Sequence, residues 1–200
     1  MVTLSIKADF QQVNRQLNAL SNAVQTRVIP AALNKTGAKA KAEMTRAITD
    51  EFNIKAADVR GRLRLSRATR NVQNWAVVLD PFSASRKGRS LNLIRFMEKN
   101  VSLAEGRRRR KAGTINQLQF QIKRIGGKKI IPNAFIGNQG RTVFVREGNQ
   151  RLPIKALSTI DIPQMFNTRR INARVVAKIR QELPIEIQRA ISAVLAGNIR

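Results

Sequence analysis

The sequence predicts an α+β fold, built as a single domain over residues 1–200. Both ends of the chain repeat apolar residues at steps of three and four, which is typical of amphipathic helices. The middle alternates apolar with polar residues between glycine-containing turns, which is typical of antiparallel strands. Two hundred residues can enclose one sizeable core, and no linker divides them. We therefore expect an N-terminal helix pair, a central antiparallel β-sheet with a long basic loop, and a C-terminal helix.

The N-terminal segment predicts a short strand followed by two helices. Alternating apolar residues at 2–6 favour the strand, and Asp9 can cap a helix whose apolar positions recur from residue 10 to 28. Pro30 should interrupt that helix or open a second one. The second is rich in alanine and lysine and should end near Asn53.

The next segment predicts strands after a short helix at 55–59. Leucines at 63 and 65 alternate with arginines, so a strand there would place the arginines on one face and the leucines on the other. Residues 74–80 indicate a buried strand that Pro81 stops. The apolar segment 91–97 fits no particular element.

The second half predicts an antiparallel meander and two more helices. Alternating apolar residues at 118–122, the stretch 129–136 and the valines around Phe144 favour strands, with turns at 126–127 and 137–140. The basic loop near 98–116 would then join two strands. Residues 160–166 suggest a short helix. Asn167 or Thr168 can cap the last helix, which Pro184 should kink or divide.

Charge is the most informative property of the composition. Lys and Arg total 38 against 12 Asp and Glu, a formal net charge of +26. Because so much unbalanced charge repels itself, the protein should need a polyanionic neighbour, either nucleic acid, an acidic protein surface or an anionic membrane. No apolar run is long enough to span a membrane and the N-terminus does not resemble a secretory signal, so we expect a protein kept in the cytosol without membrane contact.

Two arginine-rich groups are the candidate contact residues. The first is a spaced series and the second a continuous run in the expected basic loop: Arg60, Arg62, Arg64, Arg67 and Arg70, and Arg107, Arg108, Arg109, Arg110 and Lys111. Each group could follow a DNA backbone, dock an acidic protein, or only be solvated. Eight Phe, one Trp and no Tyr provide few stacking platforms, so any contact with DNA should be directed at phosphates and independent of sequence.

Catalytic chemistry is not indicated. The chain has no His, Cys or Tyr, which removes the commonest general base and the thiol nucleophile. Its carboxylates are mostly single, and the glycines and lysines at 126–129 read as a hairpin turn rather than a phosphate loop. We expect no catalytic residue, cofactor or metal; an enzyme would have to gather distant carboxylates around a divalent ion.

The order of motifs in the C-terminal half resembles the minor tail protein Z family of lambda-like phages and prophages. The resemblance extends over roughly residues 105–195, and the N-terminal helices match only in kind. It rests on the succession of RRRRKAG, IIPNAFI at 130–136, RTVFVREG, RLPIKALSTIDIPQMF at 151–166 and RQELPIEIQRAI at 180–191.

The resemblance implies a structural protein of the virion, acting in tail completion at the head-proximal (neck) end. It implies assembly with other tail or neck proteins, by default as a hexameric ring, and a role in placing the end of double-stranded DNA. Six copies would bring together a formal net charge of +156, with +26 from each. No residue role carries over. The alternative outside this family is a free-standing basic protein that binds DNA without sequence preference.

Overall fold

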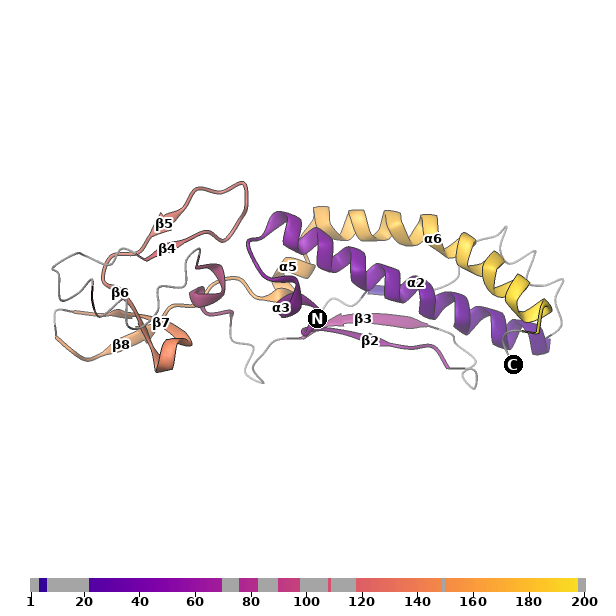
Figure 1. Cartoon of the computed structure of the whole chain (residues 1–200), viewed down its shortest axis with the longest axis horizontal. Coiled ribbons are helices and arrows are strands. Elements are labelled where there is room, and N and C mark those ends of the chain that lie inside the picture. Colours follow the sequence, from indigo (N-terminus) through magenta and orange to yellow (C-terminus); the bar gives the residue numbers. More distant parts are fainter. Residues whose placement is uncertain are drawn as a thin grey trace.

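The computed structural model describes residues 4–6, 22–69, 76–82, 90–97, 108, 118–148 and 150–197. Within them the predicted α+β class is confirmed (Figure 1). The helices are α2 (Asn22–Glu51), α3 (Ala56–Arg60), α5 (Ile162–Phe166) and α6 (Arg169–Leu195), with 3-10 turns η1 (Leu93–Phe96) and η2 (Asn138–Gly140). The strands are β1 (Leu4–Ile6), β2 (Leu63–Ser66), β3 (Val77–Pro81), β4 (Gln119–Phe120), β5 (Lys129–Ile130), β6 (Ala134–Gly137), β7 (Thr142–Arg146) and β8 (Ile154–Ala156).

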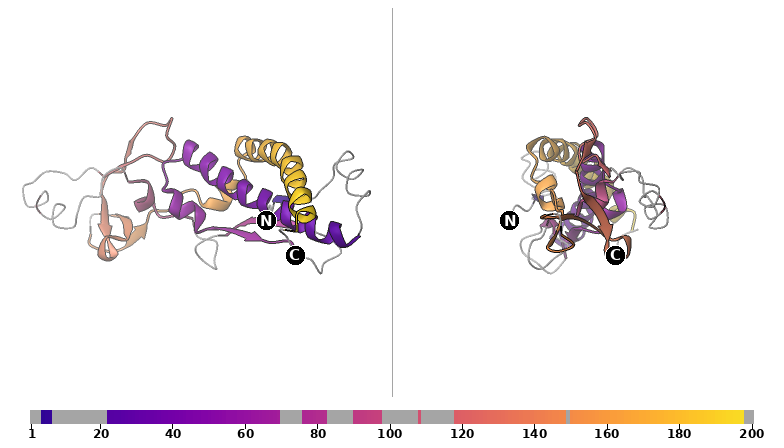
Figure 2. Two further views of the ribbon diagram at one scale, coloured as in Figure 1. Left: turned by 45° about the vertical axis from the view of Figure 1, so that its right-hand side comes forward. Right: turned by 90° about the vertical axis from the view of Figure 1, so that its left-hand side faces the viewer.

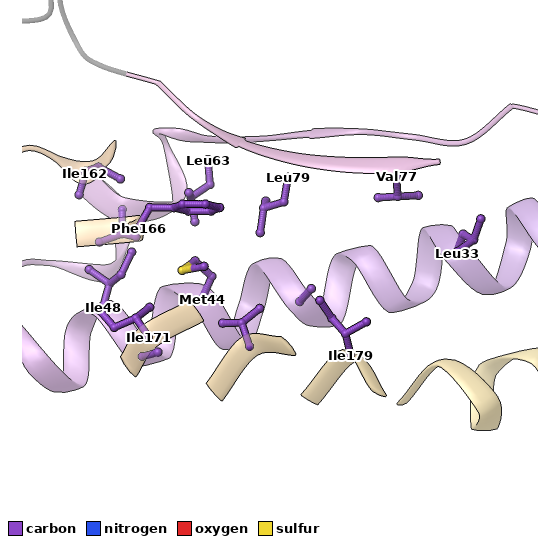
Figure 3. Packing of buried hydrophobic residues seen from close by; sticks show 14 of the residues in the cluster. Leu33, Met44, Ile48, Leu63, Val77, Leu79, Ile162, Phe166, Ile171 and Ile179 are labelled. Atoms are coloured by element: carbon purple, nitrogen blue, oxygen red, sulfur yellow. The ribbon is translucent and has the colours of Figure 1, made fainter. Parts of the chain in front are cut away.

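Helix α2 is the middle layer of three, between the sheet that contains β2 and β3 and helix α6 (Figure 1). Leu63 and Leu79 approach α2 from the strands, and Ile171 approaches it from α6 (Figure 3). Met44 of α2 is fully buried between them. Because α2 packs on two sides, small residues such as Ala32 and Ala40 are buried on it as well.

Pro30 lies inside α2, so the predicted interruption there was wrong. A proline costs a helix one backbone hydrogen bond. Burial of the neighbouring residues Val28, Ile29 and Leu33 favours the helical path by more than that cost. The helix expected over 10–28 is described only from Asn22 onward, and its earlier part lies outside the described residues. The continuous α2 ends at Glu51, close to the predicted end.

The first sheet has the antiparallel order β1-β3-β2. The predicted strands at 2–6, 62–66 and 74–80 are confirmed within the described residues, but Pro81 is part of β3 rather than its stop. Pro81 pairs with Leu63, and the next hydrogen bond runs from the Phe82 N–H to the Arg62 carbonyl at 3.0 Å. The Pro81 nitrogen therefore faces away from β2, and no ladder bond to β2 is lost.

The second half contains two sheets instead of one meander. A hairpin pairs β4 with β5, and a separate sheet has the order β6-β7-β8. The expected strand over 129–136 is divided because Pro132 and Asn133 form a turn, with Asn133 at a φ of 59°. Strand β8 was not predicted.

The predicted C-terminal helices are confirmed. Asp161 begins α5 with a capping box: its carboxylate accepts from the Gln164 N–H, and the Gln164 side-chain oxygen accepts from the Asp161 N–H at 3.0 Å. Thr168 precedes α6 as its N-cap residue, although its side chain makes no capping hydrogen bond. Helix α6 continues through Pro184 as one helix and bends along its length (Figure 2). No helix of the described residues is long and apolar enough to cross a bilayer.

Two buried clusters are joined around the end of α2. The larger lies between α2, α6 and the first sheet, and the smaller lies under the sheet β6-β7-β8. Ile122 packs against both, and its carbonyl accepts a hydrogen bond from Asn53 N–H at 2.8 Å. The previously unassigned η1 also links them, because Leu93 is buried in the smaller cluster and Phe96 in the larger.

Candidate polyanion-binding site

The acidic side chains of the protein are held in ion pairs with its own cations. The described residues include nine of the twelve carboxylates, and eight of the nine pair with Lys or Arg. The exception is the exposed Glu147. The eight are Glu43, Asp50, Glu51, Asp58, Asp80, Asp161, Glu182 and Glu186.

Five of these eight carboxylates form ion pairs across the seam between α2 and α6. Lys39 of α2 contacts Glu182 and Glu186 of α6, each at 2.6 Å. Its hydrogen bond lowers the pKa of Glu182 to about 2, with Lys178 adding to the effect. The pKa of the buried Glu186 is also lowered, first by the hydrogen bond from Lys39, against the opposing effect of burial. These carboxylates are therefore charged at neutral pH.

Arg174 makes the matching contact from α6 to α2. Its Nε lies 2.6 Å from Glu43 Oε1, and its Nη1 lies 2.8 Å from Asp50 Oδ2. The hydrogen bond to Asp50 is the first cause of the raised pKa of Arg174. These ion pairs engage nearly all of the described carboxylates. Most of the remaining cations on the described surface therefore face solvent without an acidic neighbour.

A groove of about 800 Å³ collects several of those cations between α2 and β2. Lys41 comes from α2, Arg60 ends α3, and Arg64 and Arg67 come from β2 and the residues after it. Apolar side chains lie between them, and the full lining is Ala38, Lys41, Arg60, Gly61, Leu63, Arg64, Leu65, Arg67 and Phe82.

The groove cations have little internal compensation. No carboxylate of the described residues forms an ion pair with Lys41, Arg60 or Arg67, and both arginines are exposed. Arg64 lies 3.8 Å from Asp80 Oδ2 and 5.6 Å from the centre of the Phe82 ring. A groove with this lining can bind a phosphate chain or a row of carboxylates by charge, without reading bases.

The predicted arginine series is brought together only in part. Arg60, Arg64 and Arg67 meet at the groove. Arg62 instead donates to Asp161 Oδ1 at 3.2 Å, and its side chain is only 15% exposed. Arg70 lies outside the described residues.

The basic run in the loop is described at one position. Arg108 is helical and exposed, whereas Arg107, Arg109, Arg110 and Lys111 lie outside the described residues. Lys41 is the groove residue that the sequence did not single out. The rest of α2 and most of α3 separate Lys41 from Arg60, so only the folded arrangement brings the two together.

The sequence model of the prophage minor tail protein Z (GPZ) family matches residues 9–198. The chain belongs to this family. The match includes the N-terminal helices as well as the C-terminal motifs. Comparison with curated proteins and with solved structures found no match.

As a member of the minor tail protein Z family, the protein is a structural component of a phage tail. Its place is thus the virion tail, among other tail proteins. Within the described residues, no three acidic side chains are close enough to hold a metal ion.

Proposed function

We propose that this minor tail protein completes the tail at its head-proximal end, where its basic surface holds the end of the packaged DNA by charge. The observation that carries the proposal is the division of charge: carboxylates pair inside the molecule, while groove cations face outward. A double helix carries one negative charge per roughly 1.7 Å of its axis, so it can compensate such a surface.

Assembly as a ring, with six copies as the default, is proposed from membership of the minor tail protein Z family. Each copy carries +26, so neighbouring copies repel one another unless a polyanion lies between or inside them. DNA in the channel of a ring would supply that compensation. The loop residues Arg107, Arg108, Arg109, Arg110 and Lys111 are proposed as a second contact with DNA, or with an acidic protein of the neck.

The position in the particle is tested by imaging purified particles that carry a labelled copy of the protein. We expect the label at the head-proximal end of tails, in a fixed copy number. Label absent from particles, with the protein bound to free DNA in cell extract, would reject the proposal in favour of a free-standing DNA-binding protein. Label at the distal end would reject the neck position alone.

The DNA contact is tested by neutralising the groove with Lys41→Gln, Arg60→Gln and Arg67→Gln together. Each lost phosphate contact should reduce the slope of log affinity for duplex DNA against log salt by about 0.9. The matched control is Lys55→Gln, Arg169→Gln and Arg180→Gln, three exposed cations outside the groove. Equal changes in slope for the two triple variants would contradict a DNA site in the groove.

The same variants separate two roles in particles. If tails join heads but the DNA end is misplaced, the neutralised residues contact DNA. If tails fail to incorporate the protein, the residues dock an acidic protein. Neutralising residues 107–111 in a separate variant applies the same distinction to the loop.

A further inference from the structure

The sheet β6-β7-β8 has a second face on which apolar side chains remain partly exposed. Directly opposite residues of an antiparallel pair share a face. Phe135 is opposite Phe144, and Phe144 is opposite Ala156, so these three lie together. Ile154 joins them and is 40% exposed. The other face carries Val143, which is buried in the smaller cluster, so the phenylalanines are on the outward face.

Strand β8 also has a free edge. Hydrogen bonds run from Leu157 N–H to the Val143 carbonyl and from Glu147 N–H to the Pro153 carbonyl. Bonded and non-bonded pairs alternate along an antiparallel ladder. The backbone groups of Lys155 therefore point to β7, whereas those of Ile154 and Ala156 point away from it.

Beyond β8 the chain pairs on the side of the strand that faces β7, not on the free edge. Immediately beyond β8, Asn92 pairs with Ser158, and the Leu93 N–H donates to the Leu157 carbonyl at 3.0 Å. The Leu157 N–H bonds to β7, and its carbonyl lies on the same side of the strand, so this pairing leaves the opposite edge open. Among the described residues, none takes the outward backbone groups of Ile154 and Ala156.

Positive charge surrounds this apolar surface. Arg141, Arg151 and Lys155 are exposed on or beside the sheet, against one carboxylate, Glu147. The Arg146 guanidinium lies 5.0 Å from the centre of the Phe135 ring. An occupant therefore needs apolar side chains toward the phenylalanines and negative charge at its borders.

These contacts favour a protein strand over nucleic acid or a second copy. The Phe135 ring already has Arg146 on it and Phe144 stacked at 5.9 Å, so it is not open as a platform for bases. A second copy would bring another +26. An unpaired edge with exposed apolar side chains is the arrangement to which extended peptides add as strands.

We propose that an extended acidic segment of another tail protein adds as a strand to the free edge of β8 and covers the outward face of Phe135, Phe144 and Ile154. This proposal depends on membership of the tail protein family and is independent of the DNA contact at the groove.

Hydrogen exchange of the full chain, free and in purified tails, tests it directly. The amides of Ile154 and Ala156 should exchange rapidly in the free protein and slowly in tails, and treatment with nuclease should leave their protection unchanged. Equal exchange in both states overturns the proposal. Protection that disappears with nuclease would assign the face to nucleic acid. Protection that grows with the concentration of free protein would assign it to a second copy of the chain. Either outcome overturns the proposal.

Two pairs of variants test the backbone hydrogen bond and the charge of the partner. Each variant competes with the wild type for incorporation into tails, and its occupancy is measured. Ala156→Pro removes one outward N–H, whereas Ala156→Ser keeps it. Loss of one hydrogen bond worth about 1 kcal/mol predicts about fivefold lower occupancy for the proline variant alone. Ile154→Glu and Ile154→Lys remove the same apolar side chain with opposite charge, so an acidic partner predicts lower occupancy for Ile154→Glu. Equal occupancies within both pairs would contradict the proposal, and exchange in the wild type remains the decisive measurement if the proline variant does not fold.

Discussion

At Gly37, α2 packs closely against the first sheet. A Cβ atom at this position would lie 2.5 Å from Cγ1 of Val77 in β3. Val77 is fully buried, and a β-branched side chain has little rotamer freedom with which to move away. The absence of a side chain at Gly37 therefore sets how closely the helix and the sheet can pack.

We expect Gly37→Ala to lower the free energy of unfolding by about 1 kcal/mol. Overpacking costs about 1–3 kcal/mol, which exceeds the gain of about 1 kcal/mol from replacing a helical glycine with alanine. Chemical denaturation measures the change. The control is Gly148→Ala, since nothing lies within 4 Å of a Cβ there. A stabilised Gly37→Ala variant would show that the helix and sheet can separate freely.

Arg62 has a structural role according to its contacts. It pairs with Asp161, and that carboxylate also caps α5. Arg62→Ala should lower the stability by about 2 kcal/mol, the scale of a hydrogen bond to a charged group, and should leave the salt dependence of DNA binding unchanged. Thermal unfolding and a salt titration measure the two effects. If Arg62→Ala instead reduced the slope of log affinity for DNA against log salt and left the stability unchanged, Arg62 would be a DNA-contact residue.

The sequence predicted the alternation at 63–65 correctly. It did not predict that the neighbouring arginines would make different contacts. Leu63 is buried and Arg64 is exposed, as the period of a strand requires. Arg62 precedes the strand and points to Asp161, which lies 99 positions away in the chain. Alternation contains no information about such a distant partner, and Lys41 was missed for the same reason.

At the scale of elements, long periodic segments were predictable and short ones were not. Helix α6 repeats buried residues such as Ile171, Val175 and Ile179 along 27 residues, and its position was confirmed. Strand β8 has three residues, all exposed, and its alternation of Ile154, Lys155 and Ala156 is too short to predict a strand. At Pro30 the local preference of proline was overridden by packing on two sides of α2.

The pairing of α2 with α6 should depend on pH through Glu182. Its folded pKa of about 2 lies below the ordinary value of 4.5, because Lys39 and Lys178 donate hydrogen bonds to the carboxylate. The contribution of the charged form to stability is thus present above about pH 4.5 and is lost as the pH falls toward 2.

We therefore expect Glu182→Gln to unfold at a lower temperature than the wild type at pH 7 and at nearly the same temperature at pH 2. Melting curves from pH 2 to pH 7 measure the difference. Glu147→Gln is the control, because this exposed carboxylate has no ion pair among the described residues. A constant difference for Glu182→Gln at all pH values would indicate a packing effect instead of a charge effect.

At the scale of the whole molecule, charge predicts the kind of partner better than it predicts the surface that meets it. The excess of +26 is visible in the sequence. The ion pairs engage the carboxylates and leave the groove cations without acidic partners, and these pairs depend on the packing of α2 against α6. The groove and the free edge of β8 exist only after folding, and they would serve different partners.

We propose that the two buried clusters unfold together, as expected for one domain. Ile122 packs against both clusters, and the Arg124 side chain donates to the Thr49 carbonyl of α2 at 2.6 Å. Loss of helical circular dichroism and loss of amide protection in β6-β7-β8 should therefore share one midpoint. Ile122→Ala should lower that midpoint for both signals, with a cost of about 1–2 kcal/mol for a half-buried isoleucine. Ile125→Ala is the matched control, because Ile125 is 90% exposed and should change neither signal.

Two separate midpoints in the wild type would show that the sheets of the second half form a unit of their own, which the tail could order independently of the helices.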